Sequence, residues 1–132
     1  RAFVGQNTTR WGNPEHPCPQ IGLVQGGACD AVLFELPRGE SRLILRNLRQ
    51  REGRKAQSVR FGRNGRRVRA KSFLPSPDAR VWKDGEGLVR GLLAAKGSVG
   101  TGAEYVRALI HAMDLWKIDD PLVREVWEEV RK

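Results

Sequence analysis

Apolar residues in the first part of the chain are spaced as in β-strands. Residues 21–25 and 29–36 are short apolar runs, separated by Gly26-Gly27, a pair typical of a tight hairpin turn. The preceding residues 10–19 are rich in Pro, Asn and Gly and are expected to form an ordered loop. This pattern predicts a hairpin that belongs to a sheet or barrel.

A second hairpin is predicted further along the chain. Residues 57–62 and 67–74 alternate apolar and polar side chains, and Asn64-Gly65 between them is a strong turn signal. One face is expected to carry apolar side chains and the other arginines. The apolar positions are Val59, Phe61, Val68 and Ala70.

Between the two hairpins, residues 40–52 lack Gly and Pro and place Leu43, Ile44 and Leu48 at helical spacing. Gly53 then provides a C-cap signal. The pattern predicts an amphipathic helix with Glu52 at its C-terminal end.

Helices are predicted for the last third of the chain. Residues 87–96 form one; Thr101 and Glu104 form a capping box that opens a second, and Asp120-Pro121 opens a third. Strands followed by helices favour an α+β fold over a doubly wound one. Core positions are expected at Leu88, Leu92, Leu93, Val106, Leu109, Ile110, Met113, Trp116, Leu122, Val126, Trp127 and Val130, with His111 at the edge of the core.

Composition is consistent with one folded domain over residues 1–132. Apolar residues make up 39% of the chain and charged residues 30%, a globular balance. No apolar run is long enough to cross a bilayer, and the N-terminal residues do not resemble a signal peptide. The chain is therefore expected to be soluble.

Charge is concentrated in residues 38–71, which hold 13 Lys and Arg against only Glu40 and Glu52. Such a basic stretch attracts anions, either nucleic acid or a small acidic substrate. The simplest alternative is a solvated basic face without a specific partner.

Most standard catalytic and metal-binding patterns are excluded. The chain lacks a phosphate-binding loop, a nucleotide-binding glycine fingerprint and a nucleophile elbow. Cys18 and Cys29, with His16 and His111, do not provide four ligands at zinc-finger spacing. We therefore expect no metal and two free thiols.

Local motifs along the chain resemble those of the ChaC-like γ-glutamylcyclotransferases in the same order. Arg10-Trp11-Gly12-Asn13-Pro14-Glu15-His16-Pro17 is similar to the family's Arg-Gly-Thr-Pro-Glu-His-Pro loop, and residues 26–37 resemble its next strand pair. Arg51-Glu52 resembles its Arg-Glu catalytic motif. The last two matches are Gly100-Thr101-Gly102-Ala103-Glu104-Tyr105-Val106, similar to its Gly-x-Asn-x-Glu-Tyr-Leu helix start, and Ile118-Asp119-Asp120-Pro121, similar to its closing turn.

The resemblance implies a γ-glutamylcyclotransferase-like fold, a small mixed barrel with packed helices. It also implies a cytoplasmic lyase of glutathione catabolism that cleaves glutathione to 5-oxoproline and cysteinyl-glycine without a cofactor. The family's first strand, with its Tyr-Gly-Ser-Leu loop, has no match here, so the domain is expected to lack that strand.

The resemblance makes Glu52 the expected general acid/base and Arg10, Arg51 and Tyr105 the expected substrate-binding residues. A single carboxylate suffices because the substrate's own amine is the nucleophile, and burial that raised the pKa of Glu52 would suit it to this role. The alternative is a catalytically weakened homologue that binds acidic partners or nucleic acid through residues 38–71. The oligomeric state is left open.

Overall fold

The computed structural model describes residues 1–132, which form two compact units. The first unit comprises residues 1–30 and 75–132, and the second comprises residues 31–74. Both strands and helices are present, so the α+β prediction is confirmed. None of the helices is both long and apolar enough to span a bilayer.

The first unit contains a two-stranded antiparallel sheet, in which β1 (Ala2–Asn7) pairs with β2 (Cys18–Gly22). The pairing is irregular between Phe3 and Gln6, where Gly5 has a φ of 78° that favours glycine. Phe3 is 1% exposed, so β1 supplies one of the most deeply buried side chains of the core.

The expected first hairpin is wrong. Gly26 and Gly27 do adopt left-handed conformations, but residues 29–36 form no strand and the partner of β2 is β1. The burial of Phe3 and Val4 favours this pairing, because it places two apolar side chains in the core.

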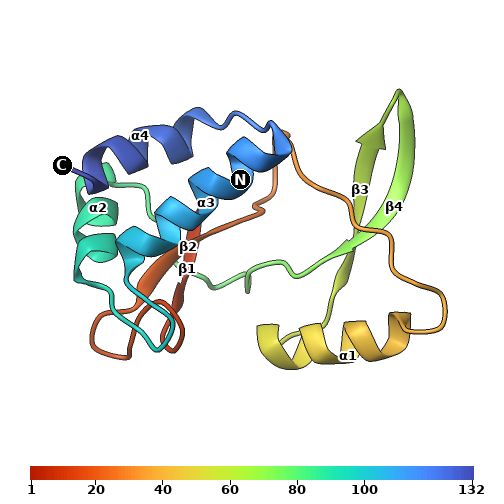
Figure 1. Cartoon of the computed structure of the whole chain (residues 1–132), viewed down its shortest axis with the longest axis horizontal. Helices are drawn as coiled ribbons and strands as arrows, with labels where there is room; N and C mark the ends of the chain where they lie inside the picture. Colours follow the sequence, from red (N-terminus) through yellow and green to blue (C-terminus); the bar gives the residue numbers. More distant parts are fainter. The chain divides into compact units, whose positions relative to one another are not determined.

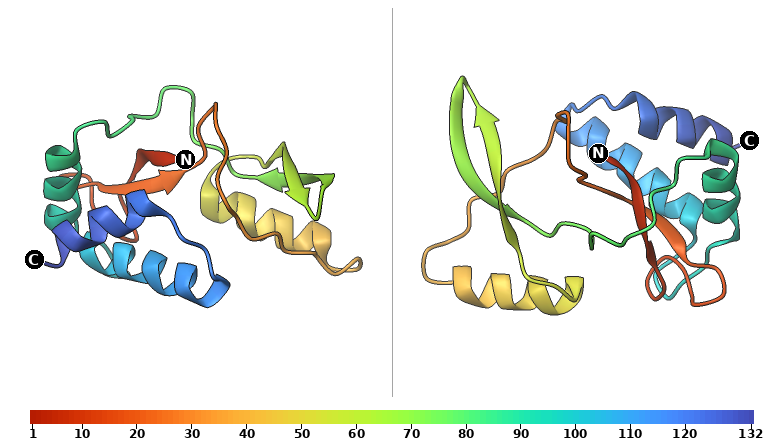
Figure 2. Two further views of the ribbon diagram at one scale, coloured as in Figure 1. Left: turned by 90° about the horizontal axis from the view of Figure 1, so that it is seen from above. Right: turned by 180° about the vertical axis from the view of Figure 1, so that it is seen from behind.

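Three helices complete the first unit: α2 (Gly85–Ala94), α3 (Gly102–Trp116) and α4 (Pro121–Val130). Figures 1 and 2 show them gathered beside the β1–β2 sheet, where α2 packs against β2, α3 and α4. The main core cluster consists of Phe3, Cys18, Leu88, Leu92, Ala95, Val106, Val126 and Val130.

The predicted N-terminal caps of α3 and α4 are present. Asp120 accepts backbone N–H groups at the start of α4, while Thr101 and Glu104 form both halves of the capping box of α3. Asp84, which was not predicted as a cap, accepts backbone N–H groups at the start of α2, two residues before the expected start.

Three core assignments are wrong: Leu93 is 57% exposed, Trp116 is 50% exposed and His111 is exposed as well. Trp116 and His111 lie off the stripe of Val106, Ile110 and Met113 that α3 buries, and α2 buries only Leu88 and Leu92.

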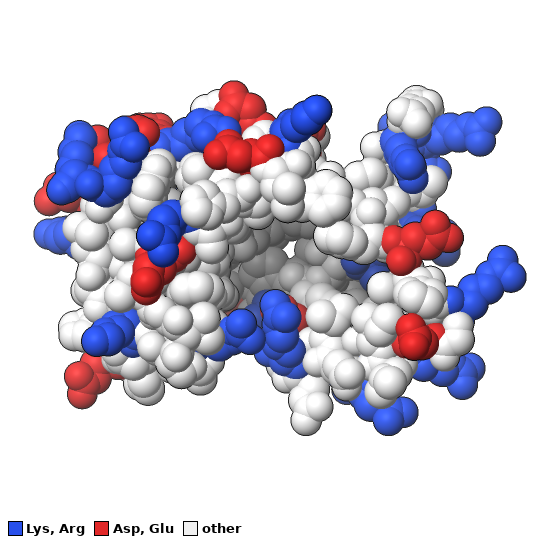
Figure 3. All heavy atoms as spheres, in the orientation of Figure 1, with Lys and Arg blue, Asp and Glu red and all other residues white.

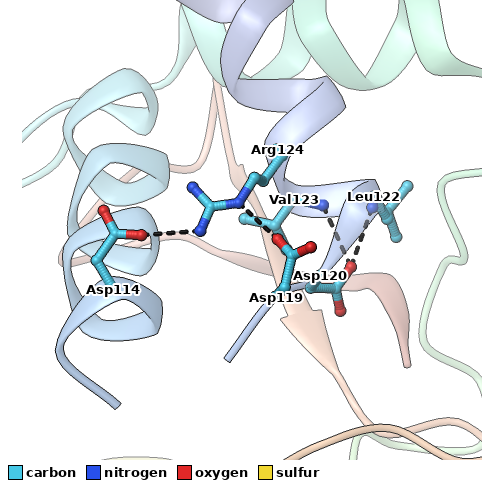
Figure 4. Close-up of polar contacts among 6 residues, drawn as sticks. All are labelled: Asp114, Asp119, Asp120, Leu122, Val123 and Arg124. Atoms are coloured by element: carbon cyan, nitrogen blue, oxygen red, sulfur yellow. Dashed lines mark hydrogen bonds and ion pairs between the residues drawn. The ribbon is translucent and has the colours of Figure 1, made fainter. Parts of the chain in front are cut away.

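The turn between α3 and α4 is held by acidic side chains (Figure 4). Arg124 of α4 bridges Asp114 at 2.8 Å and Asp119 at 2.7 Å. Asp120 accepts the N–H groups of Leu122 and Val123 and also pairs with Arg1 at 2.6 Å. Partial burial of Asp120 opposes its ionisation, but the hydrogen bonds from Arg1 and from these N–H groups outweigh it and lower its pKa.

The second unit contains α1 (Ser41–Glu52) and the hairpin of β3 (Gln57–Arg63) and β4 (Arg66–Ser72). Both predictions are confirmed: α1 ends at Gly53, whose φ is 68°, and the hairpin turns at Asn64-Gly65. No residue of this unit is fully buried.

The two cysteines differ in environment. Cys18 is fully buried in the main core, and this burial raises its pKa to about 12. Cys29 is exposed, and both thiols are free, as predicted.

Replacing Gly102 with Ala should destabilise the first unit. A Cβ at this position would lie 2.2 Å from the Leu92 carbonyl oxygen, so backbone must shift at a cost of about 1–3 kcal/mol. Urea unfolding followed by tryptophan fluorescence measures this, because all 4 Trp residues lie in the first unit. Gly85→Ala is the matched control: it is likewise the first helical residue, with open space around its Cβ. Equal stabilities of the two variants would contradict the steric argument.

Asp120→Asn tests the charge at the α3–α4 turn. Asn still caps a helix, so the substitution mainly removes the Arg1 pair and the negative charge, worth about 1 kcal/mol near neutral pH. Because the folded pKa of Asp120 is lowered from 3.8, its contribution is present above that value and lost as pH falls through the folded pKa. The stability difference between wild type and variant should therefore shrink in acid, whereas Asp78→Asn, at an exposed carboxylate, should show no such change. A pH-independent difference for Asp120→Asn would refute the assignment.

Candidate active site

The loop of residues 10–17 is ordered by two asparagine side chains. Asn7 Oδ1 accepts the backbone N–H of Arg10 at 2.8 Å, and Asn13 Oδ1 accepts that of His16 at 2.9 Å. Asn13 Nδ2 also donates to the Lys96 carbonyl at 3.0 Å. The loop is therefore fixed both internally and to the segment that follows α2, as the prediction of an ordered loop requires.

Two of the motifs that resemble the ChaC-like family contact each other. The Arg10 carbonyl accepts the N–H of Val99 at 2.7 Å and that of Gly100 at 3.3 Å, so the loop pairs with the residues that lead into α3. Gly97 makes this approach possible, because a Cβ there would lie 2.4 Å from the Arg10 carbonyl. Residues far apart in sequence thus form one local structure.

Tyr105, a predicted substrate-binding residue, lies where this structure meets the sheet. Its hydroxyl accepts the backbone N–H of Ile21 at 3.0 Å, and its ring lies 5.8 Å from that of Trp11. Burial raises the pKa of Tyr105 to about 12, so the hydroxyl stays protonated at neutral pH. No hydrogen bond from its own proton to another group of the chain is present.

Trp11 was not singled out by the sequence analysis. The useful signal would have been a large aromatic residue inside an otherwise polar loop, since such a side chain usually packs against another part of the fold. Here Trp11 packs against the core and against Tyr105.

Arg10 and Tyr105 both belong to the first unit. The side chain of Arg10 is exposed and makes no ion pair, so its guanidinium is free to bind a carboxylate. Arg10 therefore combines an ordered backbone with an available charge.

Arg51 and Glu52 occupy the last turn of α1 in the second unit. Arg51 Nε lies 3.9 Å from Glu52 Oε1, and their side chains are 60% and 40% exposed. The Gly53 N–H bonds to the Arg49 carbonyl and closes the helix immediately after Glu52. Glu52 is thus accessible, and the burial expected for a proton-transfer residue is not observed.

Neither histidine joins a constellation of possible ligands. His16 and His111 are both exposed. No group of three or more His, Cys, Asp or Glu side chains is arranged to hold a metal ion.

A hollow of about 300 Å³ lies elsewhere on the first unit, between the segment around Cys29 and the α3–α4 turn. Arg1 and Asp120 contribute to its wall. None of the four predicted site residues lines it.

The comparisons with known proteins identify the family. A family model described as ChaC-like protein matches residues 1–132. The chain belongs to the ChaC-like family. No curated protein matches it.

A solved structure supports the fold of this ChaC-like protein. The chain is similar to a crystal structure of a selenomethionine-labelled, glutathione-specific γ-glutamylcyclotransferase from yeast, with a TM-score of 0.75. The identity is 13%, over 98% of this chain and 82% of that chain. The γ-glutamylcyclotransferase-like fold expected from the motifs is therefore confirmed. The alternative of a weakened homologue that only binds acidic partners or nucleic acid is not favoured.

Tyr105→Phe tests the link between α3 and β2. The variant keeps the ring but leaves the part-buried Ile21 N–H without an acceptor, which should lower stability by about 1–3 kcal/mol. Because folding raises the pKa of Tyr105 from 10.0 to about 12, its contribution is full below pH 10.0 and declines as pH rises through the folded value. Urea unfolding at neutral and at alkaline pH measures this difference. Unchanged stability at neutral pH would show that the hydrogen bond contributes nothing.

Proposed function

We propose that this ChaC-like protein is a γ-glutamylcyclotransferase that cleaves glutathione to 5-oxoproline and cysteinyl-glycine. The observation that carries the proposal is the family match over residues 1–132. The fold shared with a yeast enzyme specific to glutathione supports it further. The substrate is a small molecule, and the proposed location is the cytoplasm, without a cofactor.

The reaction is an intramolecular acyl transfer. The α-amine of the γ-glutamyl group attacks its own γ-carbonyl carbon, so that a C–N bond closes the five-membered ring while the C–N bond to cysteine breaks. One proton leaves the attacking nitrogen and one is delivered to the departing amine. Because nucleophile and electrophile belong to one molecule, holding the substrate in a bent conformation supplies several kcal/mol of the acceleration.

Glu52 is the proposed proton carrier. Its carboxylate would accept the proton from the attacking nitrogen and return it to the leaving group, so no net proton change remains on the protein. The exposed position of Glu52 at the end of α1 lets a substrate reach it, and bound substrate would then exclude water from the carboxylate. Arg51 Nε lies 3.9 Å from this carboxylate.

The substrate-binding assignments concern three separate side chains. Arg10 of the first unit and Arg51 of the second unit are assigned separately, because each carries a guanidinium, a group that binds carboxylates such as those of glutathione. Tyr105 offers a hydroxyl proton that the fold leaves unused. Each role remains a prediction to be tested by its own substitution.

Glu52→Gln tests the central assignment. The variant keeps the size of the side chain but cannot carry the proton, so kcat should fall by about 100-fold or more. Purified protein is incubated with glutathione, and 5-oxoproline is measured by chromatography. Glu40→Gln is the matched control, because Glu40 is an exposed glutamate next to the other end of α1 and its side chain caps no N–H group.

Two outcomes are decisive. Turnover by Glu52→Gln at the wild-type rate would remove Glu52 from the mechanism while leaving the activity itself in place. Absence of 5-oxoproline from the wild-type protein, in a preparation whose circular dichroism shows it folded, would overturn the proposed function.

A further inference from the structure

The β3–β4 hairpin carries an unbalanced positive charge that the proposed reaction does not require. Residues 57–72 contain six Lys and Arg and no Asp or Glu. None of the six takes part in an ion pair, since the acidic partners of the chain's ion pairs all lie elsewhere. In Figure 3, Lys and Arg side chains gather around the turn end of the hairpin.

The register places four of these six charges on one face of the hairpin. Arg60 lies opposite Arg69, Lys71 opposite Ser58, and Arg67 opposite Gly62. Residues directly opposite in an antiparallel pair share a face, so these six positions form one surface, which we call the arginine face. All six residues are exposed.

The arginine face is costly for the isolated hairpin. Like charges placed directly opposite each other, such as Arg60 and Arg69, weaken a strand pair. A second arginine pair, Arg63 and Arg66, flanks the turn on the other face and adds to the repulsion. The hairpin has no carboxylate to offset the repulsion between these arginines, so a bound polyanion would stabilise the hairpin.

The cations are regularly spaced along one strand. Arg67, Arg69 and Lys71 alternate along β4, so successive cations are about 6.7 Å apart. Cations at this interval can each face a different phosphate, because one strand of a duplex carries one charge per about 3.4 Å of axial rise. Three of the four cations on the face are arginines, whose planar guanidinium binds phosphate oxygens in pairs.

The other side chains of the face indicate which polyanion fits. Only Ser58 and Gly62 accompany the cations, so the face has no aromatic ring to stack on a base and no apolar side chain to enter a membrane. A two-stranded ribbon is also narrow enough to lie in the major groove of DNA. Binding through such a face would be independent of base sequence.

We propose that the arginine face binds the phosphate backbone of a nucleic-acid duplex without sequence preference. The site is additional to the proposed cyclotransferase activity and uses none of its assigned residues. The variant that tests it replaces Arg60, Arg67, Arg69 and Lys71 by Gln. It relieves repulsion within the hairpin and is therefore expected to fold.

The experiment measures fluorescence anisotropy of labelled duplex DNA and duplex RNA with the full chain over a series of salt concentrations. Wild type should bind at least one duplex, with affinity that falls steeply as salt rises. The quadruple variant should reduce the slope of log K against log salt by about 3 to 4, because each phosphate contact contributes about 0.9 on DNA. At low salt its affinity should fall at least tenfold.

The matched control removes the same charge from the first unit. Lys83, Lys96, Arg107 and Lys117 are exposed and outside the ion pairs, and their replacement by Gln should change the slope by less than about 1. Equal loss of binding in both variants would mean that net charge alone attracts the duplex, and the proposal would fail. It would also fail if poly-glutamate or anionic lipid vesicles bound the arginine face as tightly as the duplex, or if no duplex bound at low salt.

Discussion

The first unit depends on close contact between backbone segments, which only glycine permits because it has no side chain. Gly12, Gly97 and Gly102 each sit where a Cβ would collide with backbone atoms at 2.4 Å or less. Because glycine has no Cβ, the loop of residues 10–17 can pair with the segment before α3, and α3 can begin directly against the end of α2. Arg10 and Tyr105 take their positions from this packing, so the proposed substrate contacts depend on glycines that touch no substrate.

Elements that depend on neighbouring residues could be predicted from the sequence. The C-terminal end of α1 follows from Gly53, and the starts of α3 and α4 follow from Thr101 and Asp120, whose side chains act within a few residues. The Asn64-Gly65 turn sets the register of its hairpin for the same reason. Pairing of β1 with β2 could not be predicted in this way, because the decisive energy is the burial of Phe3 in a cluster whose other members, apart from Cys18, lie more than eighty positions away.

The same distinction applies to the candidate site. The sequence placed Glu52 at a helix end, and the structure has it there, since that position needs only the helix and its cap. The bond between Tyr105 and Ile21 joins residues 84 positions apart, and no local pattern signals it. Gly102, which departs from the Asn of the family motif, is explained only by the Leu92 carbonyl in its path. Motif order thus predicts the site residues, whereas tertiary packing decides what each one contacts.

The different exposure of the two thiols makes the opening of the first unit's core measurable by thiol labelling. Cys29 is open to reagents at all times, whereas Cys18 can be modified only when the core around Phe3 and Leu92 separates. The ratio of their labelling rates therefore reports how often that core opens under native conditions. The strand β2 carries Cys18 and also Ile21, whose backbone N–H is bound by Tyr105. A ligand that bound at Tyr105 and stabilised the folded state would therefore lower the labelling rate of Cys18 relative to that of Cys29.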